Sequence, residues 1–406
     1  METEQPIPKP GRAARAGALS VPGFRRYFIG AAGSVQAVWM QRVALGWLAW
    51  ALSGDAAFVG AVAALLYLPA LLAGPLFGVL VDRGDARAMA WAAAAAQAAV
   101  NLALVALLLA GLVGPALLAA LAAAAGLAAA VQHPTRMSLA PRLVPLELVP
   151  SVVALTALNF NLARLVAPAI AGAIIARLGV EWTLALAALA QLPMLVALPG
   201  LRPRPVAGQA QGAVGPLMRA GLALAFGPGP LRRAMLVTGL YSLAARAVLE
   251  LLPVLADAGF GRGAAGLGLL TSAAGGGALL AALGRTVRPG LSAFGPAGRA
   301  VAAAGLGSVA LAGLAPWWPL ALAALALNGF CGTWLAVAVQ SEMQLRLGDA
   351  MRGRVMSLWV MVGLGATALG AVGQGALVEL LGIGPALAAS AAAGALALLP
   401  LIRRLD

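Results

Sequence analysis

The sequence has few of the residues that bind metals, form disulfides or hydrolyse nucleotides. Among its 406 residues there is one cysteine, Cys331, and one histidine, His133. A lone cysteine excludes a disulfide within the chain, and a lone histidine excludes a histidine-rich metal site. The GxxxxGK loop that binds phosphate in ATP-hydrolysing proteins is also absent from the sequence. We therefore expect neither an enzyme nor an ATP-driven pump, and no bound metal or cofactor.

Charged residues are also scarce, and most of them are positive. They make up 10% of the chain, whereas 62% of the residues are hydrophobic. A soluble globular protein is about half apolar and a quarter charged, so this composition indicates an integral membrane protein. The net charge of +14 could indicate a nucleic-acid partner. The arginines interrupt hydrophobic segments instead of forming a basic domain, so we expect no nucleic-acid partner and a lipid bilayer as the surroundings.

The apolar residues are grouped into segments long enough to cross a bilayer, which takes about 20 residues. Glycine, proline and charged residues separate twelve such segments. We expect helices at about 27–52, 56–81, 87–111, 115–140, 147–178, 181–200, 230–256, 262–284, 296–314, 317–345, 354–381 and 384–402. The resulting division is an N-terminal segment 1–23, a six-helix bundle 24–200, a loop 201–229 rich in proline and glycine, and a second six-helix bundle 230–406.

The distribution of arginine predicts the orientation in the membrane. Loops on the N-terminal side hold most of the 27 basic residues, whereas loops on the opposite side hold only Arg177 and Arg262. Because cytoplasmic loops carry the excess of basic residues, both termini are expected in the cytoplasm. The polar N-terminus has no hydrophobic signal-peptide core, so the first span is expected to be retained.

The two predicted bundles share a weak internal repeat. The stretch "AGAIIARLG" at 171–179 matches "QGALVELLG" at 374–382, about half the chain length further on. At the same offset, "GVLVDRGDAR" at 78–87 aligns with "AALGRTVRPG" at 281–290. Two six-helix halves with a central site between them are typical of secondary transporters.

Several motifs resemble those of the major facilitator superfamily. "GVLVDRGDAR" is similar to the superfamily's loop signature between its second and third helices, with Ala86 where a second basic residue is usual. Four further stretches together resemble the enterobactin-exporter-like and macrolide-efflux-like branch of proton-coupled exporters: "WMQRVALGW" (39–47), "HPTRMSLAPRLVP" (133–145), "NFNLARLVAPAIAG" (159–172) and "RGRVMSLW" (352–359). "ARLVAPAIAG" also resembles the fifth-helix motif of exporters; Pro168 and Gly172 match, and Ala167 replaces a usual glycine.

The resemblance implies an all-α membrane protein of twelve transmembrane helices in two six-helix pseudo-repeats, in the bacterial inner membrane. It further implies a monomer that exports a small molecule, such as a drug or siderophore, by alternating access and proton antiport. An importer or facilitator of the same fold is the alternative within transport. A non-transporting membrane receptor or scaffold is the alternative from another class.

Polar residues inside spans are costly and therefore indicate function. Arg42, Arg164 and Arg246 lie deep in the first, fifth and seventh expected helices. In the superfamily these helices border the central cavity. In this sequence Ser242, Arg246 and Glu250 follow at i, i+4 and i+8, so we expect them to form one polar stripe on the seventh helix. We expect a substrate cavity lined by Gln41, Arg42, Asn161, Arg164, Ser242, Arg246 and Glu250. The alternative is that the arginines pair with glutamates or carbonyls and hold helices together.

Proton coupling needs a group that can titrate, which arginine cannot do. Glu250 is the best candidate, and His133 is a second one near the cytoplasmic end of the fourth helix, where a helix-terminal hydrogen bond is the alternative role. Several arginines against one deep carboxylate favour an anionic substrate.

The superfamily's loop signature is implicated in a latch that holds the cytoplasmic side closed. The matching residues here are Gly78, Asp82, Arg83 and Arg87, with Arg352 and Arg354 of "MRGRVMS" as partners on the eleventh helix. Anchoring by the positive-inside rule is the alternative explanation for Arg83 and Arg87.

Overall fold

The computed structural model describes residues 17–204, 227, 229–287 and 290–402, and at a few positions inside helices it describes the backbone alone. The expected loop 201–229 therefore lies largely outside the described residues. The first half contains α2 (Pro22–Ser53), α3 (Ala56–Arg83), α4 (Ala86–Leu109), α5 (Pro115–Leu139), α6 (Val149–Leu178), α7 (Val180–Leu189) and α8 (Leu192–Ala197). The last two follow one another within the sixth expected span.

The second half begins with a helix that changes its winding several times. It runs through α10 (Pro230–Tyr241), a π-helical turn η5 (Ser242–Arg246), a 3-10 turn η6 (Ala247–Glu250), α11 (Leu252–Val254) and a second π-helical turn η7 (Leu255–Gly259). The remaining helices are regular: α12 (Gly263–Val287), α13 (Pro296–Leu314), α14 (Trp318–Arg346), α15 (Asp349–Leu381) and α16 (Ile383–Leu398).

All twelve expected ranges are helical, but fewer helices pass a test of length and apolarity. Among the described residues ten helices are long and apolar enough to cross a membrane, or eleven if the bent pair Pro230–Glu250 and Leu252–Gly259 is one span. The helix at the first expected span, α2, has 32 residues and is not among them. It is long enough to span, and the polar residues Gln41 and Arg42 lower its mean hydropathy, which is why it fails the apolarity test.

The repeat seen in the sequence recurs in how two helices end. Both α6 and α15 stop at a glycine with positive φ, Gly179 at 106° and Gly382 at 79°. In each case the glycine N–H donates to the carbonyl four residues earlier, that of Ile175 or Val378. Glycine adopts such backbone angles without steric cost, so the two equivalent stretches end their helices by the same means.

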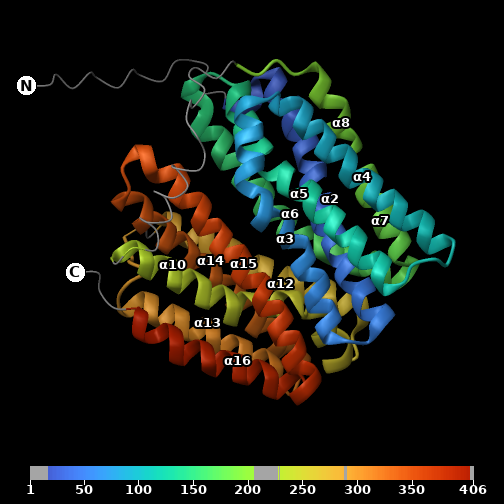
Figure 1. The fold of residues 1–406 in the computed structure, drawn as a ribbon, viewed down its shortest axis with the longest axis vertical. Coiled ribbons are helices and arrows are strands. Elements are labelled where there is room, and N and C mark those ends of the chain that lie inside the picture. Colours follow the sequence, from blue (N-terminus) through green and yellow to red (C-terminus); the bar gives the residue numbers. More distant parts are fainter. Residues whose placement is uncertain (1–16, 205–226, 228, 288–289, 403–406) are drawn as a thin grey trace, which may run out of the picture.

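The two halves form a V (Figure 1). The helices of one bundle lie beside those of the other at one end, and the bundles diverge toward the opposite end, where α2 begins and α16 ends. Contacts between the halves join α3 to α15, α6 to α12, and α2 to α11 and α12. Among the described residues, α4, α5, α7 and α8 make no extensive contact with the second half.

Glycines allow the close approach of the halves. A Cβ at Gly60 would overlap the carbonyl oxygen of Ala371, and one at Gly375 would overlap that of Ala56. At the crossing of α6 and α12, a Cβ at Gly172 would lie 2.5 Å from the oxygen of Ala264. Small residues at crossings let helix backbones touch within a membrane. Gly172 of the expected exporter motif therefore has a packing role between the halves.

Candidate functional site

The central feature of the site is an ion pair between the two halves. Arg42 of α2 donates through Nη2 to Oε1 of Glu250, which lies at the end of η6. The same nitrogen donates to the hydroxyl of Tyr67 on α3, and that hydroxyl donates to Oε1 of Glu250 at 2.8 Å. The side chains of Arg42 and Glu250 are 28% and 7% exposed, so the carboxylate depends on these two donors. The three side chains, named here the Arg42–Tyr67–Glu250 triad, form a closed ring of contacts.

Aromatic rings hold the guanidinium of Arg42 in place. The ring centre of Tyr67 lies 4.8 Å from Cζ of Arg42, and that of Trp39 lies 5.7 Å away. Trp39 in turn packs edge-on against Phe160 of α6, with ring centres 5.9 Å apart. A cation beside two aromatic faces is attracted by both ring quadrupoles, and this attraction grows where water is excluded.

A small cavity of about 40 Å³ adjoins the ion pair and is lined from both halves. Its walls come from α2, α3, η6, α11 and α12, and include Trp39, Arg42, Val59, Ala63, Glu250 and Thr271. A cavity needs roughly 10–15 Å³ to hold one water, so this one has room for about two or three. A drug-sized molecule would need a wider opening.

The broken seventh helix brings Glu250 to Arg42. A π-helical turn adds a residue to the helical repeat, and Pro253 removes a backbone donor just after Glu250. The segments on either side of this break are bent by 44°. The expectation of one regular i, i+4, i+8 stripe is therefore wrong: Ser242 is 2% exposed and packs toward Gly363 of α15, where a Cβ would lie 3.9 Å from its Oγ.

Gln41 does not line the cavity, contrary to the sequence prediction. Its Nε2 donates to Oδ1 of Asn101 on α4 at 2.8 Å, and Gln41 is 3% exposed. Neighbouring residues on a helix point about 100° apart, so Gln41 faces the interior of the first bundle while Arg42 faces the second half. Asn161 is partly exposed, and its amide donates to the carbonyl of Ala157 in its own helix at 2.8 Å.

Arg164 and Arg246 are partly buried and lie within electrostatic range of Arg42 and Glu250. Within the described part of the chain, neither arginine has an ion pair or a donated hydrogen bond. One carboxylate thus faces three guanidinium groups, which leaves the region with an excess of positive charge.

A second set of contacts joins the two halves near the C-terminal end of α2 and the N-terminal end of α3. Nε1 of Trp50 on α2 donates to Oδ2 of Asp257 in η7 at 2.8 Å. The carboxylate of Glu379 on α15 accepts from the backbone N–H of Ala56, at the start of α3, at 2.5 Å. These two bonds, named here the outer ties, lie at the ends of the helices that the arginine pattern predicts to face the cell exterior.

Several predicted residues have side chains outside the described part of the structure. They are His133, Gly78, Asp82, Arg83, Arg352 and Arg354. Their expected roles in coupling and in the cytoplasmic latch stay predictions. Pro168, by contrast, is buried in α6, where its carbonyl oxygen is 2.5 Å from a Cβ built at Gly268.

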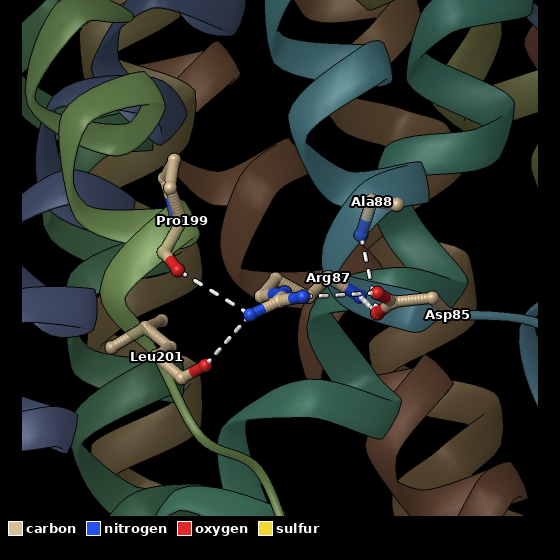
Figure 2. A network of polar contacts seen from close by, with 5 residues as sticks. All are labelled: Asp85, Arg87, Ala88, Pro199 and Leu201. Carbon is tan, nitrogen blue, oxygen red and sulfur yellow. Dashed lines mark hydrogen bonds and ion pairs between the residues drawn. The ribbon is translucent and has the colours of Figure 1, made fainter.

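Arg87 connects two segments of the first half (Figure 2). Its Nη1 donates to the carbonyls of Pro199 at 3.3 Å and Leu201 at 3.2 Å, and its Nη2 pairs with Asp85 at 3.3 Å. Asp85 also caps α4, since Oδ1 accepts from the N–H groups of Arg87 at 2.8 Å and Ala88 at 3.3 Å. The expected latch role of Arg87 across the halves stays a prediction, because these partners all belong to its own half.

The cap at Asp85 makes the stability of α4 depend on pH. Partial burial acts to raise the pKa of Asp85, but the hydrogen bonds from Arg87 and Ala88 and the charge of Arg87 outweigh it and hold the pKa below its ordinary value. A carboxyl with a lowered pKa stabilises the fold above its unfolded-state pKa and loses that contribution as pH falls through the folded-state value. We expect Asp85→Ala to cost about 1 kcal/mol at pH 7, measured by thermal unfolding.

The matched control for this prediction is Asp85→Asn, which keeps the capping oxygen and removes the charge. It should retain most of the stability and lose the acid-dependent part. Equal destabilisation by alanine and asparagine, or an unchanged pH response in the asparagine variant, would contradict the assignment.

Tyr67 is the member of the Arg42–Tyr67–Glu250 triad that sequence reasoning missed. It is one of three tyrosines and sits in the apolar stretch "LLYLPA". The available signal was its hydroxyl, a polar group in the middle of an expected span that needs a partner when buried.

Solved transporters have the same arrangement of helices. A D-xylose–proton symporter has a TM-score of 0.73 and 15% identity, covering 94% of this chain and 98% of that one. The nucleoside transporter NupG has a TM-score of 0.70 and 15% identity, covering 93% and 98%. At these identities the likeness shows the fold, which is that of the major facilitator transporters, and it confirms the predicted fold class.

The model of the transmembrane secretion effector family matches residues 15–405, so the chain belongs to this family. It is a multi-pass membrane transporter and not an enzyme, as predicted. The enterobactin exporter EntS of Escherichia coli O1:K1 / APEC is 31% identical over 263 residues, which are 62% of this chain and 60% of that protein. EntS of Shigella flexneri is 33% identical over 236 residues, or 55% and 53%. The matches thus span under two thirds of these relatives.

Proposed function

We propose that this protein exports a small molecule across the bacterial inner membrane by alternating access and proton antiport, with Glu250 as the group that carries the proton. The ion pair between Arg42 and Glu250 is the observation that carries the proposal. It joins the two halves beside the cavity, and it involves the only carboxylate in this central region among the described residues. The EntS relatives, named as exporters, support the direction of transport.

The proton acts on the contact between the halves. Ionised Glu250 attracts Arg42 and thereby holds η6 of the second half against α2 and α3 of the first. When a proton binds to Oε1 or Oε2, the carboxyl is neutral and the ion pair is lost. The outer ties and the glycine contacts then hold the halves together without the ion pair, and the exterior ends of the two halves can separate.

The orientation follows from the arginine pattern. With both termini in the cytoplasm, the end at which the two bundles diverge faces the cytoplasm, and the outer ties join the halves on the exterior side. This arrangement corresponds to a state that takes up substrate from the cytoplasm with Glu250 ionised.

The charge of the substrate is linked to the direction of proton exchange. If an anionic group of the substrate pairs with Arg42, Glu250 loses its ion partner and is protonated more readily. Anion and proton then bind together. Antiport needs competition, which arises where a neutral or cationic group of the substrate meets ionised Glu250. The anionic group favoured by the excess of arginine therefore binds at Arg164 and Arg246, which have no ion partner among the described residues.

The test uses inverted membrane vesicles with an acidic interior, in which export appears as accumulation. Enterobactin and a panel of carboxylates with their matched amides serve as probes, and Glu250→Gln serves as the coupling variant. We expect accumulation that needs the pH gradient and is lost in Glu250→Gln. Equilibration of a probe across the membrane without a pH gradient would indicate a facilitator, loss of a preloaded probe from the vesicle lumen an importer, and no movement of any probe a receptor or scaffold.

A further inference from the structure

Glu250 has a second contact besides Arg42, the hydroxyl of Tyr67, and this contact has a role that the ion pair alone does not supply. Tyr67 can hydrogen-bond to Glu250 in both protonation states of the carboxyl without relying on its negative charge. A phenol donates to a carboxylate, and it can equally donate to the carbonyl oxygen of a neutral carboxyl. Arg42, in contrast, is held mainly by the negative charge of the carboxylate.

We propose that Tyr67 is a positioning residue that keeps Glu250 at the cavity during proton exchange. Its hydroxyl donates to Oε1 of Glu250 at 2.8 Å and accepts from Arg42, while its ring lies 4.8 Å from the guanidinium carbon. When Glu250 takes up a proton, Arg42 is released and Tyr67 retains the carboxyl. This inference rests on the proposed coupling role of Glu250.

The position of Tyr67 on α3 links the proton to the movement of the halves. The same helix carries Gly60, which contacts Ala371, and Ala56, whose N–H donates to Glu379. A change in the hydrogen bonds of Glu250 therefore acts, through Tyr67, on α3, the helix that contacts the second half at the exterior side. The other groups that act on Glu250 are Arg42 on α2, Arg164 on α6 and Arg246 on its own broken helix.

Infrared difference spectroscopy of the purified protein in lipid tests the inference without a substrate. Acidification of the wild type should produce a carboxyl C=O band that is absent in Glu250→Gln. A C=O group that loses a hydrogen bond vibrates at higher frequency, so this band should move upward in Tyr67→Phe. The ring remains in that variant, which preserves packing against Arg42.

The control is Tyr241→Phe, because the Tyr241 hydroxyl is buried without a hydrogen-bond partner among the described residues. It should leave the band in place. A Glu250 band at the wild-type frequency in Tyr67→Phe would overturn the role of Tyr67 and leave the coupling proposal intact. A spectrum with no band that depends on Glu250 would overturn the coupling assignment and, with it, this inference.

In vesicles, Tyr67→Phe should lower gradient-driven accumulation about ten- to 100-fold, because it removes a hydrogen bond to a charged group. Exchange of a transported probe at equal pH on both sides does not need the proton and should be preserved. A parallel loss of driven accumulation and exchange would show a structural defect instead of a positioning role, and would contradict the proposal.

Discussion

Replacing Arg42 by alanine is expected to destabilise the protein by roughly 3 kcal/mol, because it leaves a carboxylate that is 7% exposed without its cation. Adding Glu250→Gln should recover most of that loss, since a neutral amide needs no counter-charge. Gradient-driven transport should be absent in all three variants. Thermal unfolding of the two single variants and the double variant measures the coupling between the residues.

The double variant decides between two roles of Arg42. If Arg42 neutralises Glu250, as the ion pair indicates, the losses in free energy of unfolding caused by the two single substitutions are strongly non-additive in the double variant. If Arg42 serves only to contact substrate, the two costs add, and this result would contradict the account. Arg177→Ala, an exposed arginine away from the site, is the control and should change stability by less than about 0.5 kcal/mol.

Placing a methyl group at Gly375 is expected to force the exterior ends of the halves apart. A Cβ there would overlap the backbone oxygen of Ala56, and a backbone contact cannot be relieved by a change of rotamer. Overpacking of this kind costs about 1–3 kcal/mol, which is enough to shift the balance between two states of a transporter. The outward-open state should therefore gain population in Gly375→Ala.

The matched control lies two residues away on the same helix, since a Cβ at Gly373 would meet nothing within 4 Å. Spin labels at Leu112 and Leu314, both exposed, report the distance between the exterior ends. Replacing Cys331 first removes the only native cysteine. The distance should lengthen in Gly375→Ala and stay unchanged in Gly373→Ala; identical distances in both would contradict the close contact described here.

The fold could be predicted from the sequence because hydropathy and arginine placement are local signals. Each apolar segment is bounded by glycine, proline or charge, and all twelve segments are helical in the structure. The family resemblance rested on short motifs at helix ends, such as the loop at 78–87, and the family match over residues 15–405 agrees with it.

The site could be predicted only in part, because its geometry depends on departures from a regular helix. Arg42 and Glu250 were identifiable as costly charges within spans, but the pairing required the π and 3-10 turns and Pro253 to aim Glu250 at α2. Gln41 was assigned to the cavity as the neighbour of Arg42, although adjacent helical residues face different ways. Tyr67 was overlooked because an aromatic residue in an apolar run resembles ordinary packing.

The outer ties could not be predicted from the sequence for a different reason. Trp50 and Asp257 come from different halves, and so do Ala56 and Glu379, so no spacing along the chain indicates either bond. Only the packing of α2 and α3 against η7 and α15 brings them together.

In the proposed transport cycle, protonation of Glu250 releases a contact between the two halves. The distance between spin labels at Leu112 and Leu314, measured in lipid at neutral and acidic pH, tests this step. We predict that the distance lengthens on acidification of the wild type, and that Glu250→Gln shows the longer distance at both pH values. A distance that does not respond to pH, or a response that persists unchanged in Glu250→Gln, would contradict the claim.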